Sequence, residues 1–157
     1  MKRLSLFACA LVLACSSATP ATNNNIVQPE VDLYQVIGPA DMNYPKGAIE
    51  VQFAVHVANR SAEAITLRQV DIVPVGLGGP YRVRTRTYPI NEQIAANGSR
   101  DIEFWAQADA SGDQFANDAN APVSVRAIAH FQTAGGAFRR ILMKTFSQDG
   151  TGVRGRS

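Results

Sequence analysis

Residues Val51–Ile72 read VQFAVHVANRSAEAITLRQVDI and contain two alternating apolar runs. An apolar residue at every second position is the period of a β-strand with one face in a core. The positions expected to face that core are Val51, Phe53, Val55 and Val57, then Ile65, Leu67, Val70 and Ile72. The change of phase in the second run predicts a β-bulge near Arg68–Gln69.

The rest of the chain after Glu30 has the same character. Short segments rich in Val, Ile, Phe and Thr are bounded by Gly, Pro, Asn and Asp, with no helical apolar period. The predicted strands are Val31–Ile37, Ala48–Ala58, Ala64–Val73, Tyr81–Tyr88, Ser99–Gln107, Val123–Gln132 and Ala137–Phe146. Seven strands in about 120 residues predict an all-β, antiparallel sandwich.

Two segments carry a resemblance to known families. Val51–Ile72, in which a strand ending in Asn precedes a second alternating strand, resembles bacterial immunoglobulin-like domains and, more loosely, the water-stress domains of late-embryogenesis-abundant proteins. Ile94–Phe104 (IAANGSRDIEF) is similar to the turn into a late strand of such sandwiches, and Asn97-Gly98 is the pair typical of a tight hairpin. Asn59-Arg60-Ser61 stands where water-stress domains often show Asn-Pro, so the immunoglobulin-like resemblance ranks first. It implies a fold and no activity.

The N-terminus has the pattern of a secretory signal peptide. Met1-Lys2-Arg3 is basic, and Leu4–Ala14 (LSLFACALVLA) is an uncharged apolar run followed by polar residues. A membrane-spanning helix needs about 20 apolar residues, so this run is too short to be a permanent anchor. We expect residues 1–14 to be removed.

Val12-Leu13-Ala14-Cys15 resembles the lipobox of bacterial lipoproteins. The resemblance implies cleavage after Ala14 and a lipid on Cys15, which would hold the protein on a membrane. Ser16 in the next position is similar to the signal for transfer to the outer membrane, facing the periplasm. The alternative is an ordinary secreted protein cut further on, after Ala18 or Ala21.

The mature chain is expected to have three parts. Residues 15–29, rich in Ser, Thr, Asn and Ala, form a flexible tether; residues 30–147 form the β-sandwich domain; and residues 148–157 form a flexible tail. The two cysteines, Cys9 and Cys15, both precede this domain. The sandwich domain is therefore expected to contain no disulfide, no thiolate metal site and no cysteine nucleophile.

The charge balance argues against nucleic acid as a partner. The full chain has 15 Lys and Arg against 13 Asp and Glu, and loss of Lys2 and Arg3 with the signal peptide leaves equal numbers. Sequence-independent binding of nucleic acid depends on a broad basic surface. A formally neutral mature chain lacks that property.

Metal and cofactor sites are not expected. His56 and His130 fall on the outward sides of strands far apart in the sequence, without Cys or carboxylates at ligand spacing beside them. Asp109, Asp113 and Asp118 share a long loop, but their spacing does not match an EF-hand and favours a solvated loop.

Catalytic patterns are also missing from the sequence. No Gly-x-Ser-x-Gly elbow occurs, and neither histidine has an evident partner. Asp101 and Glu103 alternate along one predicted strand of an arginine-rich chain, which indicates ion pairing rather than acid–base catalysis. We expect no enzymatic activity.

One surface feature suggests binding. Arg82, Arg84 and Arg86 occupy alternate positions of one predicted strand, followed by Tyr88. One interpretation pairs these arginines with Asp101, Glu103 and Trp105 on a neighbouring strand. The other is a binding face for an anionic partner, anchored by Trp105 and Tyr88.

The sequence therefore predicts a lipid-anchored envelope protein whose sandwich is a non-enzymatic binding or assembly module. Its expected partners are the membrane, through the anchor, and another envelope protein. Confinement to a membrane raises the effective concentration for such a partner. The alternative is a periplasmic carrier of a small ligand or metal, and an enzyme ranks third.

Overall fold

The computed structural model describes residues 27–38, 47–76, 79–110 and 121–146, in which eight β-strands lie. The strands are β1 (Glu30–Ile37), β2 (Gly47–Ala58), β3 (Ile65–Val75), β4 (Tyr81–Val83), β5 (Arg86–Ile94), β6 (Ser99–Ala110), β7 (Val123–Thr133) and β8 (Gly136–Phe146). Within the described ranges there is no helix long and apolar enough to cross a membrane.

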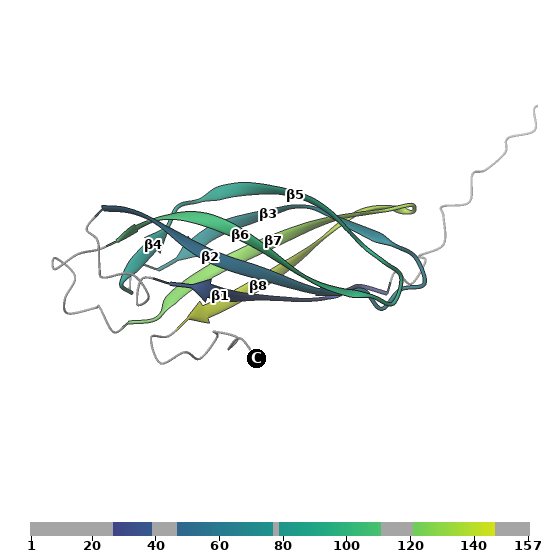
Figure 1. The fold of residues 1–157 in the computed structure, drawn as a ribbon, viewed down its shortest axis with the longest axis horizontal. Coiled ribbons are helices and arrows are strands. Elements are labelled where there is room, and N and C mark those ends of the chain that lie inside the picture. The colour runs from purple at the N-terminus through teal and green to yellow at the C-terminus, as the bar shows by residue number, and fades with distance from the viewer. Residues whose placement is uncertain (1–26, 39–46, 77–78, 111–120, 147–157) are drawn as a thin grey trace, which may run out of the picture.

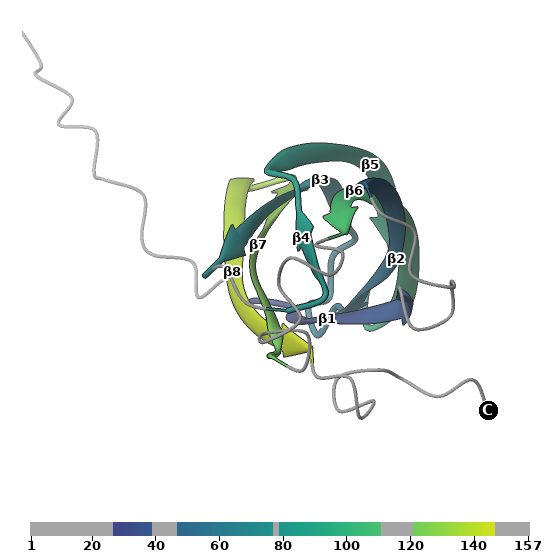
Figure 2. The same ribbon diagram turned by 90° about the vertical axis from the view of Figure 1, so that its left-hand side faces the viewer.

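The strands form two antiparallel four-stranded sheets, which together make a β-sandwich. Sheet A has the order β1-β2-β6-β4, and sheet B has the order β5-β3-β7-β8. The strands run along the long axis of the molecule (Figure 1). Viewed from one end, the two sheets surround a common interior, with β1 beside β8 (Figure 2).

The interior is filled by the inward face of each sheet. The largest fully buried side chains are Phe53, Phe131, Leu33, Leu67, Ile72, Ile94, Val51, Val55, Val57, Val70, Val83 and Val125. Phe53 packs against Phe104 at 6.1 Å and against Phe146 at 5.5 Å between ring centroids. Aromatic contacts therefore connect β2 and β6 of sheet A with β8 of sheet B.

Six of the seven predicted strands are confirmed, with ends that shift by up to three residues. The alternation is also confirmed, because all the core positions named within Val51–Ile72 are at most 3% exposed. The bulge predicted near Arg68–Gln69 is present, since the register of β3 shifts between Leu67 and Gln69 against both of its neighbours. The alternation of apolar residues was enough for these predictions, because the side of a strand that a residue faces depends only on its position relative to its neighbours in the sequence.

The predicted strand Tyr81–Tyr88 is wrong as a single strand. The chain pairs with β6 of sheet A only over Tyr81–Val83, then crosses to sheet B, where Arg86 begins β5. This crossing makes the observed strand count eight rather than seven. Both halves are alternating and β-prone, so the sequence does not reveal the change of sheet.

The Asn97-Gly98 pair is a turn, as predicted, but it does not close a hairpin. It joins β5 of sheet B to β6 of sheet A, and of its two residues Asn97 has the positive φ, at 53°. A tight hairpin instead joins β7 to β8, where Thr133 pairs with Gly136. Gly136 has a φ of 131°, which favours glycine at this position.

The edges of the two sheets meet along β1 and β8. Lys144 on β8 pairs with Asp32 on β1 at 2.5 Å, and Arg140 on β8 donates a hydrogen bond to Gln28, just before β1. Charged side chains on an edge strand also discourage pairing with strands of other molecules.

Several predictions concern residues outside those that the structure describes. They are the signal peptide at residues 1–14, the lipid on Cys15, most of the tether, the loop residues Asp113 and Asp118, and the tail at residues 148–157. These stay predictions.

Candidate functional site

The predicted arginine stripe is divided between the two sheets. Arg82 and Arg84 flank the inward-facing Val83 and project from the outer face of sheet A, near the end of β6. Arg86 and Tyr88 belong to β5 in sheet B. The sequence prediction that these residues share one face is therefore wrong, because the chain changes sheets between Arg84 and Arg86.

Arg84 is held by a carboxylate further along β6 than the sequence suggested. Its Nε donates to Asp109 Oδ2 at 2.9 Å and its Nη2 to Asp109 Oδ1 at 2.5 Å. This bidentate contact raises the pKa of Arg84 and lowers that of Asp109. Asp101 and Glu103 are not its partners, because β4 pairs with the last residues of β6, Val83 opposite Ala108.

Arg86 and Tyr88 form a contact of their own. The Arg86 guanidinium carbon lies 6.0 Å from the centroid of the Tyr88 ring, within the range of a cation–π interaction. Tyr88 is only 8% exposed and packs against Phe104 at 5.0 Å. Burial raises the pKa of its hydroxyl, which accepts a hydrogen bond from the backbone N–H of Gln107 at 3.3 Å. Tyr88 is thus a core residue rather than the surface anchor that the sequence suggested.

Trp105 is the predicted site residue that remains a surface aromatic. Its side chain is 47% exposed on the outer face of β6, opposite Gln52 of β2. The amide of Gln52 donates to Glu103 Oε2 at 2.8 Å, which fixes the polar side chains beside the indole. Trp105, Arg82 and Arg84 therefore occupy the same outer face, and Arg86 and Tyr88 do not.

A shallow hollow lies next to Trp105. Its volume is about 200 Å³, and its lining residues are Ala48, Ile49, Glu50, Arg84 and Gln107. Gln107 follows Trp105 on the outer side of β6 and pairs in register with Glu50 of β2. The hollow thus continues the outer face of sheet A toward β4.

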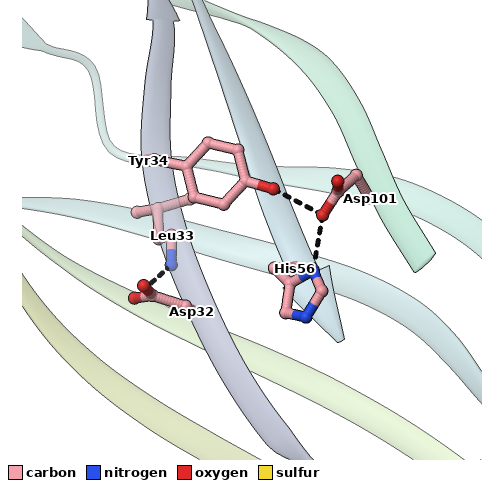
Figure 3. Close-up of polar contacts among 5 residues, drawn as sticks. All are labelled: Asp32, Leu33, Tyr34, His56 and Asp101. Carbon is pink, nitrogen blue, oxygen red and sulfur yellow. Dashed lines mark hydrogen bonds and ion pairs between the residues drawn. The ribbon is translucent and has the colours of Figure 1, made fainter. Parts of the chain in front are cut away.

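A polar cluster that the sequence analysis missed lies further along the same face (Figure 3). Asp101 accepts a hydrogen bond from the Tyr34 hydroxyl, and its Oδ1 lies 2.6 Å from His56 Nδ1. Register places His56 between Asp32 of β1 and Asp101 of β6. The prediction that Asp101 pairs with the arginines at positions 82–86 is wrong, because β4 pairs with the other end of β6. Strand pairing was the signal needed to find the contacts with Tyr34 and His56.

His130 has a similar carboxylate partner on the outer face of sheet B. Its Nε2 lies 2.7 Å from Asp71 Oδ2, while Thr87 donates to Asp71 Oδ1 at 2.7 Å. Partial burial, the largest single influence, raises the pKa of Asp71, but these hydrogen bonds and the charge of His130 together lower it below its usual range. Both histidines of the chain are therefore paired with aspartate, which the sequence analysis did not foresee.

The substitution Asp71→Asn is expected to lower the free energy of unfolding at pH 7 by about 1 kcal/mol, since it removes a charge-assisted, half-buried contact. A carboxylate whose pKa is lower in the folded state stabilises the fold when the pH is above its unfolded pKa. This contribution to stability is lost as the pH falls through the folded pKa. The difference between wild type and variant should therefore begin to shrink near pH 4, the ordinary range of an aspartate, and disappear only at a pH below the folded pKa. Urea unfolding at several pH values measures it.

The control for this prediction is Asp109→Asn, which removes the exposed partner of Arg84 and should leave stability nearly unchanged. A difference between wild type and Asp71→Asn that stays constant from pH 7 to pH 3 would contradict the assignment.

Among the described residues, no group of three or more His, Cys, Asp or Glu side chains is arranged to hold a metal ion. Each histidine has one carboxylate partner, and His56 and His130 lie on different sheets. The polar groups on the outer faces are thus arranged in pairs and short hydrogen-bonded clusters. Such groups can contact a partner molecule through exposed side chains.

No protein-family model matches this chain, and no curated protein sequence matches it. Among solved structures, one described as the ApaA protein from Bordetella pertussis has a TM-score of 0.51 and 10% identity, covering 76% of this chain and 93% of its own. A protein from Archaeoglobus fulgidus has a TM-score of 0.49 and 11% identity, covering 77% and 98%. A late embryogenesis abundant (LEA) protein in solution has a TM-score of 0.44 and 12% identity, covering 79% and 75%. The first similarity supports the all-β fold alone.

Proposed function

We propose that this chain is a bacterial envelope lipoprotein whose β-sandwich is a non-enzymatic binding or assembly module. In this proposal a lipid on Cys15 anchors it to the outer membrane, facing the periplasm. The basic start, the short apolar run and the lipobox-like Val12-Leu13-Ala14-Cys15 support the anchor. The outer face of sheet A supports the binding role.

The exposure of Trp105 is the observation that carries the binding role. An indole that is 47% exposed leaves a large apolar surface in water, on a strand whose alternate residues are already committed to the core. Tryptophan and arginine are enriched among the residues that contribute most to protein interfaces. Arg82 and Arg84 project from the same outer face.

We call the set Glu50, Arg82, Arg84, Trp105 and Gln107 the Trp105 face. It combines one large aromatic side chain with both signs of charge and an amide, which suits a protein surface with a polar rim. The hollow within it, about 200 Å³, is smaller than the roughly 300 Å³ at which pockets for small ligands begin. At the Trp105 face, this comparison favours a protein partner over a small ligand.

The strand order supports an immunoglobulin-like class for the sandwich. β2 lies beside β6, and β3, β7 and β8 are neighbours in that order, as strands B–E and C–F–G are in that class. β5 occupies the place beside the third strand that variable-type domains fill with an added strand. The chain departs from the class in placing β4, which pairs with β6, before β5.

A photo-crosslinking amino acid in place of Gln107, in the full chain expressed in bacteria, tests the Trp105 face. We expect one discrete adduct with an envelope protein. The substitution Trp105→Ala should reduce its yield at least about tenfold, because a central tryptophan typically contributes 2 kcal/mol or more to binding. Gln132→Ala, at an exposed position of β7 on the opposite sheet, is the control and should leave the yield unchanged.

The anchor is tested in the same cells with a labelled fatty acid. The chain should incorporate the label, and Cys15→Ser should lose both the label and most of the adduct. An adduct that persists in Trp105→Ala would contradict the proposed face. A labelled chain with no adduct at all would leave the anchor in place and reject the protein-binding role.

A further inference from the structure

The outer face of sheet B carries an apolar patch on its exposed side. Ile141 is 57% exposed and Met143 is 60% exposed on β8, and Val75 on β3 is 40% exposed. Ile128 of β7 lies opposite Ile141, and Val73 of β3 lies in the row of Met143. We call Val73, Val75, Ile128, Ile141 and Met143 the apolar patch. Exposed apolar side chains gathered on three neighbouring strands are typical of a contact site.

The charges around the apolar patch are mainly positive. Arg126 lies between Val73 and Met143 in one cross-strand row, and Arg139 lies opposite His130 in another. Both arginines are exposed. The carboxylate on the same face is that of Asp71, and its charge is balanced by the contact with His130. The face is therefore apolar and basic.

The opposite face of the sandwich has the reverse charge. Among the described residues, the carboxylates on the outer face of sheet A are Glu30, Asp32, Glu50, Asp101, Glu103 and Asp109. The cations near them are fewer, namely Arg82 and Arg84 on the face, Arg60 beside Glu30 and Lys144 beside Asp32. A surface of negative potential would therefore attract sheet B and repel sheet A. This asymmetry gives the molecule a preferred orientation beside an anionic surface.

The start of the described chain lies along the same edge as the apolar patch. Gln28 accepts a hydrogen bond from Arg140, and Asp32 pairs with Lys144, so the chain enters the sandwich beside β8. The segment from Cys15 to Val27 can span at most about 40 Å when fully extended. A lipid on Cys15 would thus hold the start of β1, and β8 beside it, within about 40 Å of the bilayer.

From this geometry we infer that the outer face of sheet B docks onto the surface of an anionic phospholipid membrane, with the apolar patch at the interface. The inference rests on the proposed anchor at Cys15. Apolar side chains combined with arginines bind such surfaces through burial and attraction to anionic headgroups. Docking through sheet B leaves the Trp105 face turned away from the membrane and open to a partner.

Tryptophan quenching by brominated lipid tests this orientation. Trp105 is the one tryptophan of the chain and reports on sheet A. The double variant Trp105→Phe/Met143→Trp moves the reporter to the apolar patch, and Trp105→Phe/Ile141→Trp provides a second reporter. The full-length lipidated proteins are reconstituted into vesicles of phosphatidylglycerol and dibrominated phosphatidylcholine, and circular dichroism checks the fold.

We expect the reporter at position 143 or 141 to lose at least about half of its emission, because interfacial apolar side chains lie ~5–10 Å below the headgroups. Trp105 in the wild type should lose little. Reversal of both charges, Arg126→Glu with Arg139→Glu, should remove most of the quenching at position 143. Vesicles without phosphatidylglycerol should have the same effect.

Four results would overturn the inference. A chain that does not float with the vesicles would reject both the anchor and the docking. A chain that floats without quenching at positions 143 and 141 would reject the docking alone. Equal quenching of Trp105 and of the new reporters would show that no face is preferred. A blue shift of the reporter with rising protein concentration and no lipid would assign the apolar patch to a second copy of the chain.

Discussion

Replacement of Phe53 by Ala is expected to lower the free energy of unfolding by about 3–5 kcal/mol. The Phe53 side chain is 0% exposed and packs on Phe104 of its own sheet and on Phe146 of the other. Its removal leaves a cavity between two sheets whose backbones are tied by their hydrogen-bond ladders, so little of the space can close. Urea unfolding followed by far-ultraviolet circular dichroism measures the loss.

The matched control is Trp105→Ala, which removes a large aromatic side chain from the outer face of the neighbouring strand. It should cost less than about 1 kcal/mol, because a half-exposed side chain leaves no internal cavity. The free energy of unfolding of domains of this size is typically about 5–15 kcal/mol, so Phe53→Ala should remove a large part of it. Equal losses for the two variants would contradict the role of Phe53 as the link between the sheets.

Asn59→Asp is expected to be similarly disruptive, although it exchanges only an amide for a carboxyl. The Asn59 side chain is 1% exposed and donates to the carbonyl of Glu63 at 2.8 Å and to that of Ala95 at 2.9 Å. Its Oδ1 accepts from the Ser61 backbone N–H at 3.0 Å. Asn59 thus connects the turn after β2 with the turn before β6. A buried carboxylate facing two carbonyl oxygens should cost about 3–5 kcal/mol at pH 7.

The pH dependence of Asn59→Asp separates this explanation from a simple loss of packing. Burial raises the pKa of a carboxyl in the folded state, so its protonated form stabilises below the unfolded pKa, and stability is lost as pH rises through the folded pKa. The deficit relative to wild type should therefore be smaller at pH 4 than at pH 7. Asn59→Ala, which has no titrating group, is the control and should show a deficit that does not change with pH.

The strands and their inward faces were predictable from the sequence because both depend on neighbours two residues apart. Alternation identified Phe53, Leu67 and Phe131 as core residues, and each is at most 1% exposed. The bulge in β3 was visible as a shift in the same period. Alternation does not indicate the sheet to which a strand belongs. For this reason the division between β4 and β5 was not predicted.

The composition of the candidate site depends on which sheet each strand belongs to. Arg82, Arg84 and Trp105 share a face because β4 pairs with the end of β6, whereas Tyr88 is buried because β5 lies in the other sheet. From the sequence, His56 and His130 were expected to be surface residues without partners, whereas both pair with aspartate. Neither the apolar patch nor its position near the start of β1 could be found without the order of the strands.

Six of the strands, the side of each that faces the core, and the position of the cysteines before the sandwich could be predicted from the sequence, because these properties are local. The pairing of polar side chains, in contrast, depends on the tertiary structure. His56 and Asp101 are 45 residues apart, His130 and Asp71 are 59 apart, and Arg84 and Asp109 are 25 apart. Each pair meets only when strands distant in the chain become neighbours in a defined register. That register is set by the requirement that every strand buries its apolar face in the common core, because a shift by one residue would turn this face to solvent.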